Sequence, residues 1–195
     1  MKNTLKLLTS FVLATLITAC ACSSCAPAPN FDEILSPQES EFFSLIQSMC
    51  GKTFVGESVY PEDPGHDFAG KKLVATIDYC DNQHIAIPFT VGEDESRTWH
   101  LNKTYQGLLF KHEHRLKDGS PDPVTNYGGY SASYKGEAVT ATKHFFHADD
   151  FTAELIPDAK TNVWMLEVDP ENQELTYYLE RHGKPRYKAV LQLKE

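Results

Sequence analysis

The sequence predicts an all-β domain of antiparallel strands, preceded by one short amphipathic helix. From Lys52 onward, apolar residues alternate with a period of two, and turn residues interrupt the pattern every eight to twelve positions. No segment of helical length separates the predicted strands, so an antiparallel meander is a simpler topology than a parallel sheet. Just before Lys52 the apolar residues follow helical spacing instead, which predicts the helix.

A secretory leader opens the chain. Residues 1–6 form a basic start, and Leu7 to Ala19 form an uncharged, mostly apolar run that is too short to span a bilayer as a helix. We therefore interpret residues 1–19 as a signal peptide. Removing them from the 195-residue chain leaves a length that suits one domain with a sizeable core.

The end of this leader, Ile17-Thr18-Ala19-Cys20, resembles the lipobox of bacterial lipoproteins. The resemblance implies cleavage before Cys20 and acylation of that cysteine, so that a lipid anchor reaches the membrane. The next residue is Ala21 rather than Asp, which by the same resemblance implies the outer membrane of a Gram-negative cell. The expected localisation is the cell envelope, with the protein facing the periplasm.

Acidic side chains dominate the mature chain. The whole sequence has 18 basic and 27 acidic side chains, and residues 1–19 contain two of the basic ones and none of the acidic ones, so the formal charge after cleavage is about −11. Such a surface repels nucleic acid and anionic lipid. We therefore expect no nucleic-acid partner, and we expect acyl chains rather than surface charge to attach the protein to the membrane.

Residues 20–35 are expected to be the lipidated cysteine and a flexible tether, and residues 36–195 the domain. The tether is rich in Ala, Pro, Ser and Cys and cannot bury an apolar face. Cys22 and Cys25 either pair with each other or remain small tether residues, and both alternatives are open.

The domain begins with the predicted helix. Ser36-Pro37-Gln38-Glu39 is a capping box with proline at the first helical position. The apolar residues that then recur at helical spacing, up to Gly51, are Phe42, Leu45, Ile46 and Met49.

Ten strands are predicted after the helix. Pro88 marks a bulge or an edge in the third of them, over 84–91. Gly128 and Gly129 fit a close backbone approach, a bulge or a bend of the sheet. The predicted strands cover residues 52–60, 71–80, 84–91, 97–103, 107–116, 128–134, 137–145, 162–168, 174–182 and 186–194.

Three hairpin registers follow from the rule that residues directly opposite each other share a face. The turn at Tyr105 and Gln106 pairs Leu101 with Phe110, Trp99 with His112, and Arg97 with His114. A four-residue loop over 170–173 sets Val168, Leu166 and Trp164 against Leu175, Tyr177 and Leu179. A three-residue loop over 183–185 sets Leu179 against Ala189, Tyr177 against Leu191, Leu175 against Leu193, and Arg181 against Tyr187.

Cys50 and Cys80 are predicted to form a disulfide. Cys50 precedes the first strand and Cys80 ends the second, and an antiparallel turn brings the beginning of one strand beside the end of the other. An oxidising compartment favours the pairing.

This layout of short antiparallel strands after a helix resembles the calycin barrels, which comprise the lipocalins and the fatty-acid-binding proteins. Gly51-Lys52-Thr53-Phe54 opens the first strand where many lipocalins have Gly-x-Trp, with Phe54 in place of Trp, and Arg186 begins the last strand where many have a basic residue that packs across it. The resemblance implies an up-and-down barrel of about 8–10 strands. Residues 111–115, 118–122 and 127–129 also resemble a group of uncharacterised bacterial proteins, which implies no activity.

The inner face of such a barrel contains cations among aromatic rings. Buried cations need an anion, so we predict a cavity that binds a small hydrophobic or amphipathic anion, with its carboxylate or phosphate held by arginine. The alternative is that Arg97 and Arg181 lie at the barrel rims, where they reach water or carboxylates. The predicted ligand-binding residues are Arg97, Trp99, Phe110, His112, His114, Trp164, Tyr177, Arg181 and Tyr187.

The histidines suggest further chemistry. His112 and His114 point the same way on one strand, as the ligands of some β-scaffold metal sites do, but two ligands do not make a site. We therefore predict no metal and no cofactor. Residues 144–150 group histidines with acids, and we interpret them as a strand end followed by a turn capped by Asp149 or Asp150 rather than as acid–base machinery. We predict no catalytic residue.

The leading functional prediction is a lipid-anchored envelope lipoprotein that binds a small amphipathic anion without catalysis. Two alternatives remain open. One is an envelope scaffold whose barrel is filled by side chains and whose surface binds a protein. The other is an enzyme, or a metal- or haem-binding barrel, that uses His112 and His114.

Overall fold

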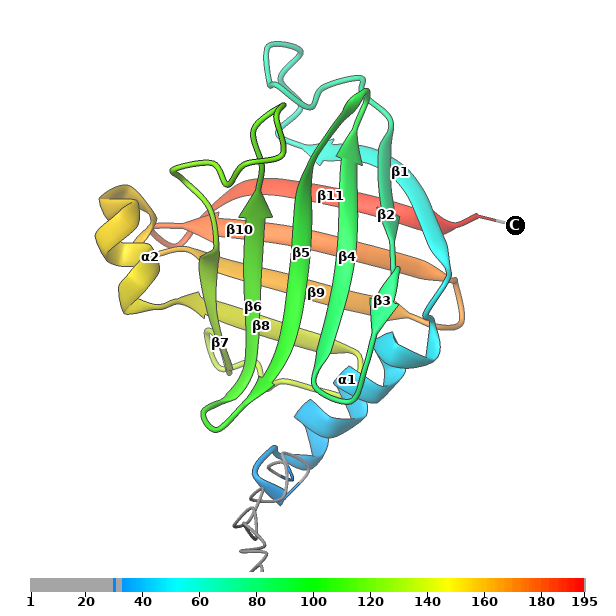
Figure 1. The fold of residues 1–195 in the computed structure, drawn as a ribbon, viewed down its shortest axis with the longest axis vertical. Helices are drawn as coiled ribbons and strands as arrows, with labels where there is room; N and C mark the ends of the chain where they lie inside the picture. Colours follow the sequence, from blue (N-terminus) through cyan, green and yellow to red (C-terminus); the bar gives the residue numbers. More distant parts are fainter. Residues whose placement is uncertain (1–29, 31–32, 195) are drawn as a thin grey trace, which may run out of the picture.

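The structure is a computed structural model that describes residues 30 and 33–194 (Figure 1). Its α-helices are α1 (Pro37–Ser48) and α2 (Asp150–Leu155), and Pro157–Ala159 forms a 3₁₀ turn. The described strands are β1 (Thr53–Tyr60), β2 (Leu73–Thr76), β3 (Tyr79–Cys80), β4 (His84–Val91), β5 (Asp94–Thr104), β6 (Gly107–His114), β7 (Tyr127–Ala132), β8 (Lys143–Ala148), β9 (Val163–Asp169), β10 (Glu174–Arg181) and β11 (Lys184–Leu193). The expected signal peptide, Cys20, Cys22 and Cys25 lie outside the described residues.

The strands close into a barrel in which sequence neighbours are mostly sheet neighbours. Their order is β2-β1-β11-β10-β9-β8-β7-β6-β5-β4-β3, and β2 also pairs with β4. Because β2 and β3 lie along the same edge of β4, the ring has ten strand positions. This confirms the predicted all-β, antiparallel up-and-down barrel with a short N-terminal helix. No helix of the described residues is long and apolar enough to cross a membrane.

Pro88 explains why one predicted strand, over 71–80, is split into β2 and β3. The carbonyl of Ala86 accepts a hydrogen bond from the backbone N–H of Asp78 (3.1 Å). Ala86 therefore directs its backbone polar groups toward β2 and β3. Every second residue of a strand faces the same neighbour, so Pro88, two residues after Ala86, faces β2 and β3 as well. It has no N–H to donate, so the ladder breaks beside it. Strand β4 is paired on both sides and is therefore not an edge strand, and its pairing with β5 has an irregularity just after Pro88, between Phe89 and Val91.

Helix α1 closes one end of the barrel, opposite to the end with the long loops 61–72 and 115–126 (Figure 1). The predicted capping box is present: the Ser36 hydroxyl accepts a hydrogen bond from the Glu39 N–H (3.3 Å), and the Glu39 carboxylate accepts one from the Ser36 N–H (3.0 Å). The Phe42, Phe43 and Ile46 side chains are fully buried. They join the core that fills this half of the barrel.

The predicted disulfide between Cys50 and Cys80 is confirmed, with the two Cα atoms 6.2 Å apart. It joins the segment between α1 and β1 to the end of β3. A loop of 30 residues closed in this way is stabilised by roughly 3.5 kcal/mol in the chain-entropy description of disulfides.

Two predicted hairpin registers are confirmed, those of β5–β6 and β9–β10. Trp99 lies opposite His112, and Trp164 lies opposite Leu179. The side-chain alternation of these strands was therefore sufficient to place their inner faces.

The register of the third hairpin, β10–β11, is wrong by two residues. Tyr177 pairs with Ala189 rather than with Leu191, and beyond the bulge Arg181 pairs with Lys184 rather than with Tyr187. The reason is the turn, which contains only His182 and Gly183, both at positive φ (53° and 70°). A bulge beside this turn keeps the predicted side chains on the inner face although their partners change.

The strand predicted over 137–145 is also wrong in its bounds, because β8 spans Lys143–Ala148. The preceding residues are β-prone, but the Thr140 hydroxyl accepts hydrogen bonds from the backbone N–H groups of Thr142 (3.2 Å) and Lys143 (3.0 Å). This local turn replaces a ladder. The loop then contributes Tyr134 and Val139 to a small apolar cluster with Phe145, Val163 and Met165.

Candidate functional site

A cavity of about 470 Å³ opens at the end of the barrel where loop 61–72 lies. Its walls come from loop 61–72 and from the ends of β4, β5, β6, β7, β10 and β11 that meet there. The volume falls within the usual range of small-molecule sites. The lining residues are Pro61, His66, Asp67, Phe68, Phe89, Arg97, Trp99, His112, Glu113, His114, Tyr127, Tyr177, Leu179, Arg186 and Tyr187.

Loop 61–72 covers part of the mouth by packing two rings against Tyr187. The His66 ring stacks on Tyr187 with centroids 5.4 Å apart, and Phe68 meets the same ring edge-on at 5.4 Å. The Tyr187 hydroxyl is hydrogen-bonded to the Ser58 hydroxyl (2.8 Å). Burial raises the pKa of Tyr187 to about 12, so the phenol stays neutral.

A stack of three aromatic rings forms one wall of the cavity. Trp99 lies between Phe89, at a centroid distance of 4.3 Å, and Tyr177, at 4.7 Å, with interplanar angles of 19° and 9°. Such offset stacking adds to the stability that burial alone provides. Both faces of the Trp99 ring are thus occupied by the protein.

His112 forms the floor of the cavity and is neutral. Its Nδ1 lies 3.2 Å from the Tyr127 carbonyl oxygen, which only accepts, so Nδ1 carries the hydrogen. Nε2 is then the acceptor for the Tyr177 hydroxyl, 3.0 Å away. Burial lowers the pKa of His112 to about 3, and the bond to Tyr127 opposes this only partly. Both ring nitrogens are engaged, which leaves no free lone pair for a metal or for proton transfer.

Tyr127 links the floor to the rim. Its ring stacks on His112 with centroids 4.9 Å apart, and its hydroxyl is 3.0 Å from Nε2 of His114. Burial raises the pKa of Tyr127 to about 12. Burial also lowers the pKa of His114, and the nearby charge of Arg97 lowers it further. Both groups are therefore held in their neutral forms.

Two of the arginines at this end are already engaged. Arg97 forms a close ion pair with Asp94, and its guanidinium lies over the Phe68 ring, 5.2 Å from the centroid. Arg181 donates a hydrogen bond from Nε to the side-chain oxygen of Asn162 (2.8 Å). Arg97 thus matches the alternative in which a rim arginine meets a carboxylate.

Arg186 is the unpaired residue of the β11 bulge. Leu179 pairs with Tyr187 and the next residue of β10, Glu180, pairs with Pro185, so Arg186 has no partner across this pair of strands. A bulge of this kind redirects the side chain of its extra residue. Arg186 is exposed and lines the cavity, and it forms no ion pair with another residue of the described chain.

Six of the nine predicted ligand-binding residues line the cavity: Arg97, Trp99, His112, His114, Tyr177 and Tyr187. Phe110 and Trp164 point inward but lie in the filled core beneath the floor, each 1% exposed or less. Arg181 does not line the cavity. The expectation that it lies beside Tyr187 fails because its strand partner is Lys184.

Sequence reasoning missed several lining residues. Tyr127 lies at the start of β7, one residue before the predicted strand, and Phe89 is an inward residue of β4. Strand alternation would have found both. His66 and Phe68 lie in a loop without periodicity, so only the structure places them.

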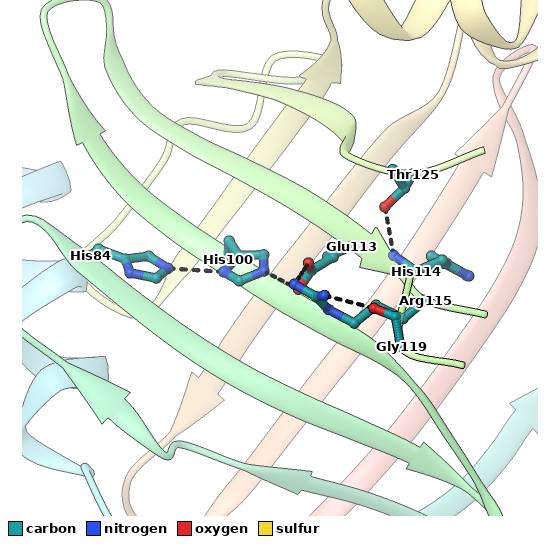
Figure 2. Close-up of polar contacts among 7 residues, drawn as sticks. All are labelled: His84, His100, Glu113, His114, Arg115, Gly119 and Thr125. Atoms are coloured by element: carbon teal, nitrogen blue, oxygen red, sulfur yellow. Dashed lines mark hydrogen bonds and ion pairs between the residues drawn. The ribbon is translucent and has the colours of Figure 1, made fainter. Parts of the chain in front are cut away.

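The outer face of β4, β5 and β6 carries a separate polar network (Figure 2). Nε2 of His84 is 2.8 Å from Nδ1 of His100, and Nε2 of His100 is 3.1 Å from the Glu113 carboxylate. Glu113 also pairs with Arg115, which donates to the Gly119 carbonyl (3.0 Å). Because a carboxylate only accepts, His100 donates through Nε2 and accepts from His84. The network fastens loop 115–126 to the barrel wall.

A second, more open depression of about 860 Å³ lies outside the barrel. It is lined by the β4–β5 turn, by Lys71, by residues 115–117 and by Gly119. Its side chains carry both charges and no aromatic ring, and none of the predicted ligand-binding residues lies in it. We therefore regard the smaller aromatic cavity as the candidate site.

Residues 144–150 have the structural roles expected for them. Nε2 of His144 donates to the Gln38 carbonyl of the α1 helix (3.3 Å), and Nδ1 accepts from the Ser131 hydroxyl (2.7 Å). Asp149 is the N-cap of α2, accepting from the Thr152 N–H (2.9 Å). Gly128 and Gly129 permit a close backbone approach, since an added Cβ would lie 1.9 Å and 1.5 Å from carbonyl oxygens of β6 and β8.

Within residues 30 and 33–194, no group of three or more His, Cys, Asp or Glu side chains is arranged to hold a metal ion. Comparison of the chain with protein-family models finds no match, and comparisons with curated proteins and with solved structures find none either. Functional assignment therefore rests on the geometry of the cavity.

Proposed function

We propose that this protein is a lipid-anchored lipoprotein of the cell envelope that binds a small amphipathic anion in the cavity at the barrel mouth. The observation that carries the proposal is the division of the cavity into an aromatic, uncharged interior and an entrance with cationic side chains. An apolar ligand body gains about 25 cal/mol per Å² of surface removed from water, and a cation at the entrance favours a negatively charged group.

The interior of the cavity supports this proposal because its polar groups are already paired. The His112 ring and the Tyr177 hydroxyl bond to each other, and the Tyr187 hydroxyl bonds to Ser58. An apolar ligand that covers these groups breaks none of their hydrogen bonds. The same pairing disfavours a catalytic role for His112.

The anchor is proposed from the leader and Cys20. Helix α1, which follows the tether in sequence, lies at the end of the barrel opposite to loop 61–72 (Figure 1), and that loop lines the cavity. Mass analysis of the mature N-terminus should find an acylated Cys20, and Cys20→Ser should release the protein from membranes, since each buried methylene of an acyl chain contributes about 0.8 kcal/mol. Cleavage at another residue would refute this part of the proposal.

Ligand binding can be tested by blocking the cavity. The probe is 1-anilinonaphthalene-8-sulfonate, an aromatic anion, titrated against the intact chain in nanodiscs of zwitterionic lipid. Leu179→Trp places a larger side chain in the cavity and should abolish saturable binding. Phe151→Trp, at an exposed position of α2, is the matched control and should bind the probe as the wild type does.

Native mass spectrometry of gently purified protein gives a second test, with a co-purified small anion as the expected result. Equal probe binding by the wild type and by a folded Leu179→Trp variant would contradict the proposal. Complete absence of saturable binding by the wild type would instead favour a scaffold that acts through its surface.

A further inference from the structure

We propose that the ligand is a compact anion, a carboxylate or sulfonate carried on one or two rings, bound with its charged group at Arg186 and its ring body against the aromatic wall. This inference rests on the proposed function and adds the head-group residue, the orientation and the size class. It replaces Arg97 and Arg181, the arginines that the sequence suggested for this role.

Arg186 is the arginine that is free to receive an anion. Arg97 is neutralised by Asp94, and Arg181 bonds to Asn162. Arg186 sits in the bulge and lines the entrance, with no ion pair among the described residues. The Arg186 charge also contributes, after burial, to the lowered pKa of Arg181, so an anion bound at Arg186 would reduce a repulsion.

The charged group binds at the entrance because the floor offers it no cation. His112 is neutral, and the one hydrogen of the Tyr177 hydroxyl is donated to it. A carboxylate pushed to this depth would lose its water and gain no new donor, which is costly. The entrance keeps the charged group in contact with both Arg186 and solvent.

The ligand is compact because the barrel is filled beneath the floor. Phe110, Phe146 and Trp164 are each 1% exposed or less, and they belong to one core cluster that continues to α1. An extended alkyl chain has no channel to enter. The cavity of about 470 Å³, lined by Trp99 and Tyr187 among other rings, suits a body of one or two rings.

Asp67 is the charged residue of the entrance that opposes this ligand. It is an exposed residue of loop 61–72 and lines the same cavity. Its carboxylate repels an anion at short range, so Asp67→Asn should bind the anion more tightly than the wild type does. Glu113, the other lining carboxylate, is already paired with Arg115 and His100.

The test compares 2-naphthoate with 2-naphthamide, which has nearly the same shape and no charge. Calorimetric titrations use the intact chain in zwitterionic nanodiscs, and titrations of empty nanodiscs are subtracted. The wild type should bind the carboxylate about tenfold more tightly than the amide, since hydrogen bonds to charged groups are the stronger kind. Arg186→Gln should remove this preference and leave amide binding unchanged, and Arg186→Lys should restore part of it.

Lys52→Gln is the charge control, because it removes one positive charge at an exposed position that does not line the cavity. It should keep the preference for the carboxylate. A preference that survives in Arg186→Gln, or equal binding of the two probes by the wild type, would overturn the assignment of Arg186. Tighter binding of dodecanoate than of 2-naphthoate would overturn the size class. If neither naphthalene probe binds, the proposed function itself fails.

Discussion

The inner and outer faces of β5 and β6 carry histidines in opposite chemical situations, although the two strands are neighbours in the sheet. On the inner face, His112 packs among Trp99, Tyr127 and Tyr177, and its pKa falls to about 3. On the outer face, the neighbouring Glu113 accepts a hydrogen bond from His100 at the border with solvent (Figure 2).

The difference shows how one alternating strand pair serves two purposes. The inner residues line the cavity, and the polar atoms of His112, Tyr177 and Tyr187 are already hydrogen-bonded within the protein. The outer residues bond through charge, and they hold loop 115–126, which lies at the same end of the barrel as loop 61–72 (Figure 1). Substitutions on the inner face should therefore act mainly through packing and desolvation, and those on the outer face through weak, screened electrostatics.

The largest contrast is expected between Trp99→Ala and His100→Ala. Trp99 is 2% exposed and stacked on both faces, so its truncation should lower the free energy of unfolding by about 3–5 kcal/mol. His100 is partly exposed, and its truncation should cost less than about 1 kcal/mol. Denaturant unfolding of the two variants measures the contrast. Similar losses for both would show that the outer network is as important for stability as the core.

The sequence alone was sufficient for much of this comparison. The apolar alternation and a two-residue turn placed Trp99 opposite His112 and separated the two faces correctly. These features depend on neighbours in sequence, and strand geometry transmits them directly.

The rest depends on contacts that leave no periodic signal. The bulge that exposes Arg186 at the cavity, and excludes Arg181 from it, follows from a turn whose His182 adopts positive φ, which is uncommon for residues other than glycine. Likewise, the packing of His66 and Phe68 on Tyr187 joins a loop to a strand far away in the chain. Alternation predicts neither contact.

The second prediction concerns pH. An unfolded histidine titrates near pH 6.5, whereas folded His112 has a pKa of about 3, so between these values the unfolded chain binds a proton that the folded chain does not. Stability should therefore fall as the pH falls through this window, by up to about 1.4 kcal/mol per pH unit for this residue. Thermal or denaturant unfolding of His112→Gln at about pH 7 and pH 5 should show a smaller loss than the wild type.

A second buried histidine, His144, also makes the stability depend on pH. Burial lowers the pKa of His144 to about 4, so it too destabilises the folded chain as the pH falls, and it does so equally in the wild type and in His112→Gln. Its presence means that His112→Gln reduces the pH dependence without abolishing it. An unchanged slope in that variant would contradict a neutral, desolvated His112.

The smallest effect is expected for Glu113→Gln on the outer face. The substitution keeps the shape of the side chain and removes the charge that His100 and Arg115 share. Such pairs near the surface contribute about 0.2–1 kcal/mol, and salt screens them, so the loss should be measurable at about 0.05 M salt and nearly absent at about 1 M. A stability loss that is independent of salt would mean that Glu113 acts as a buried hydrogen-bond acceptor, and the outer face would then resemble the inner one.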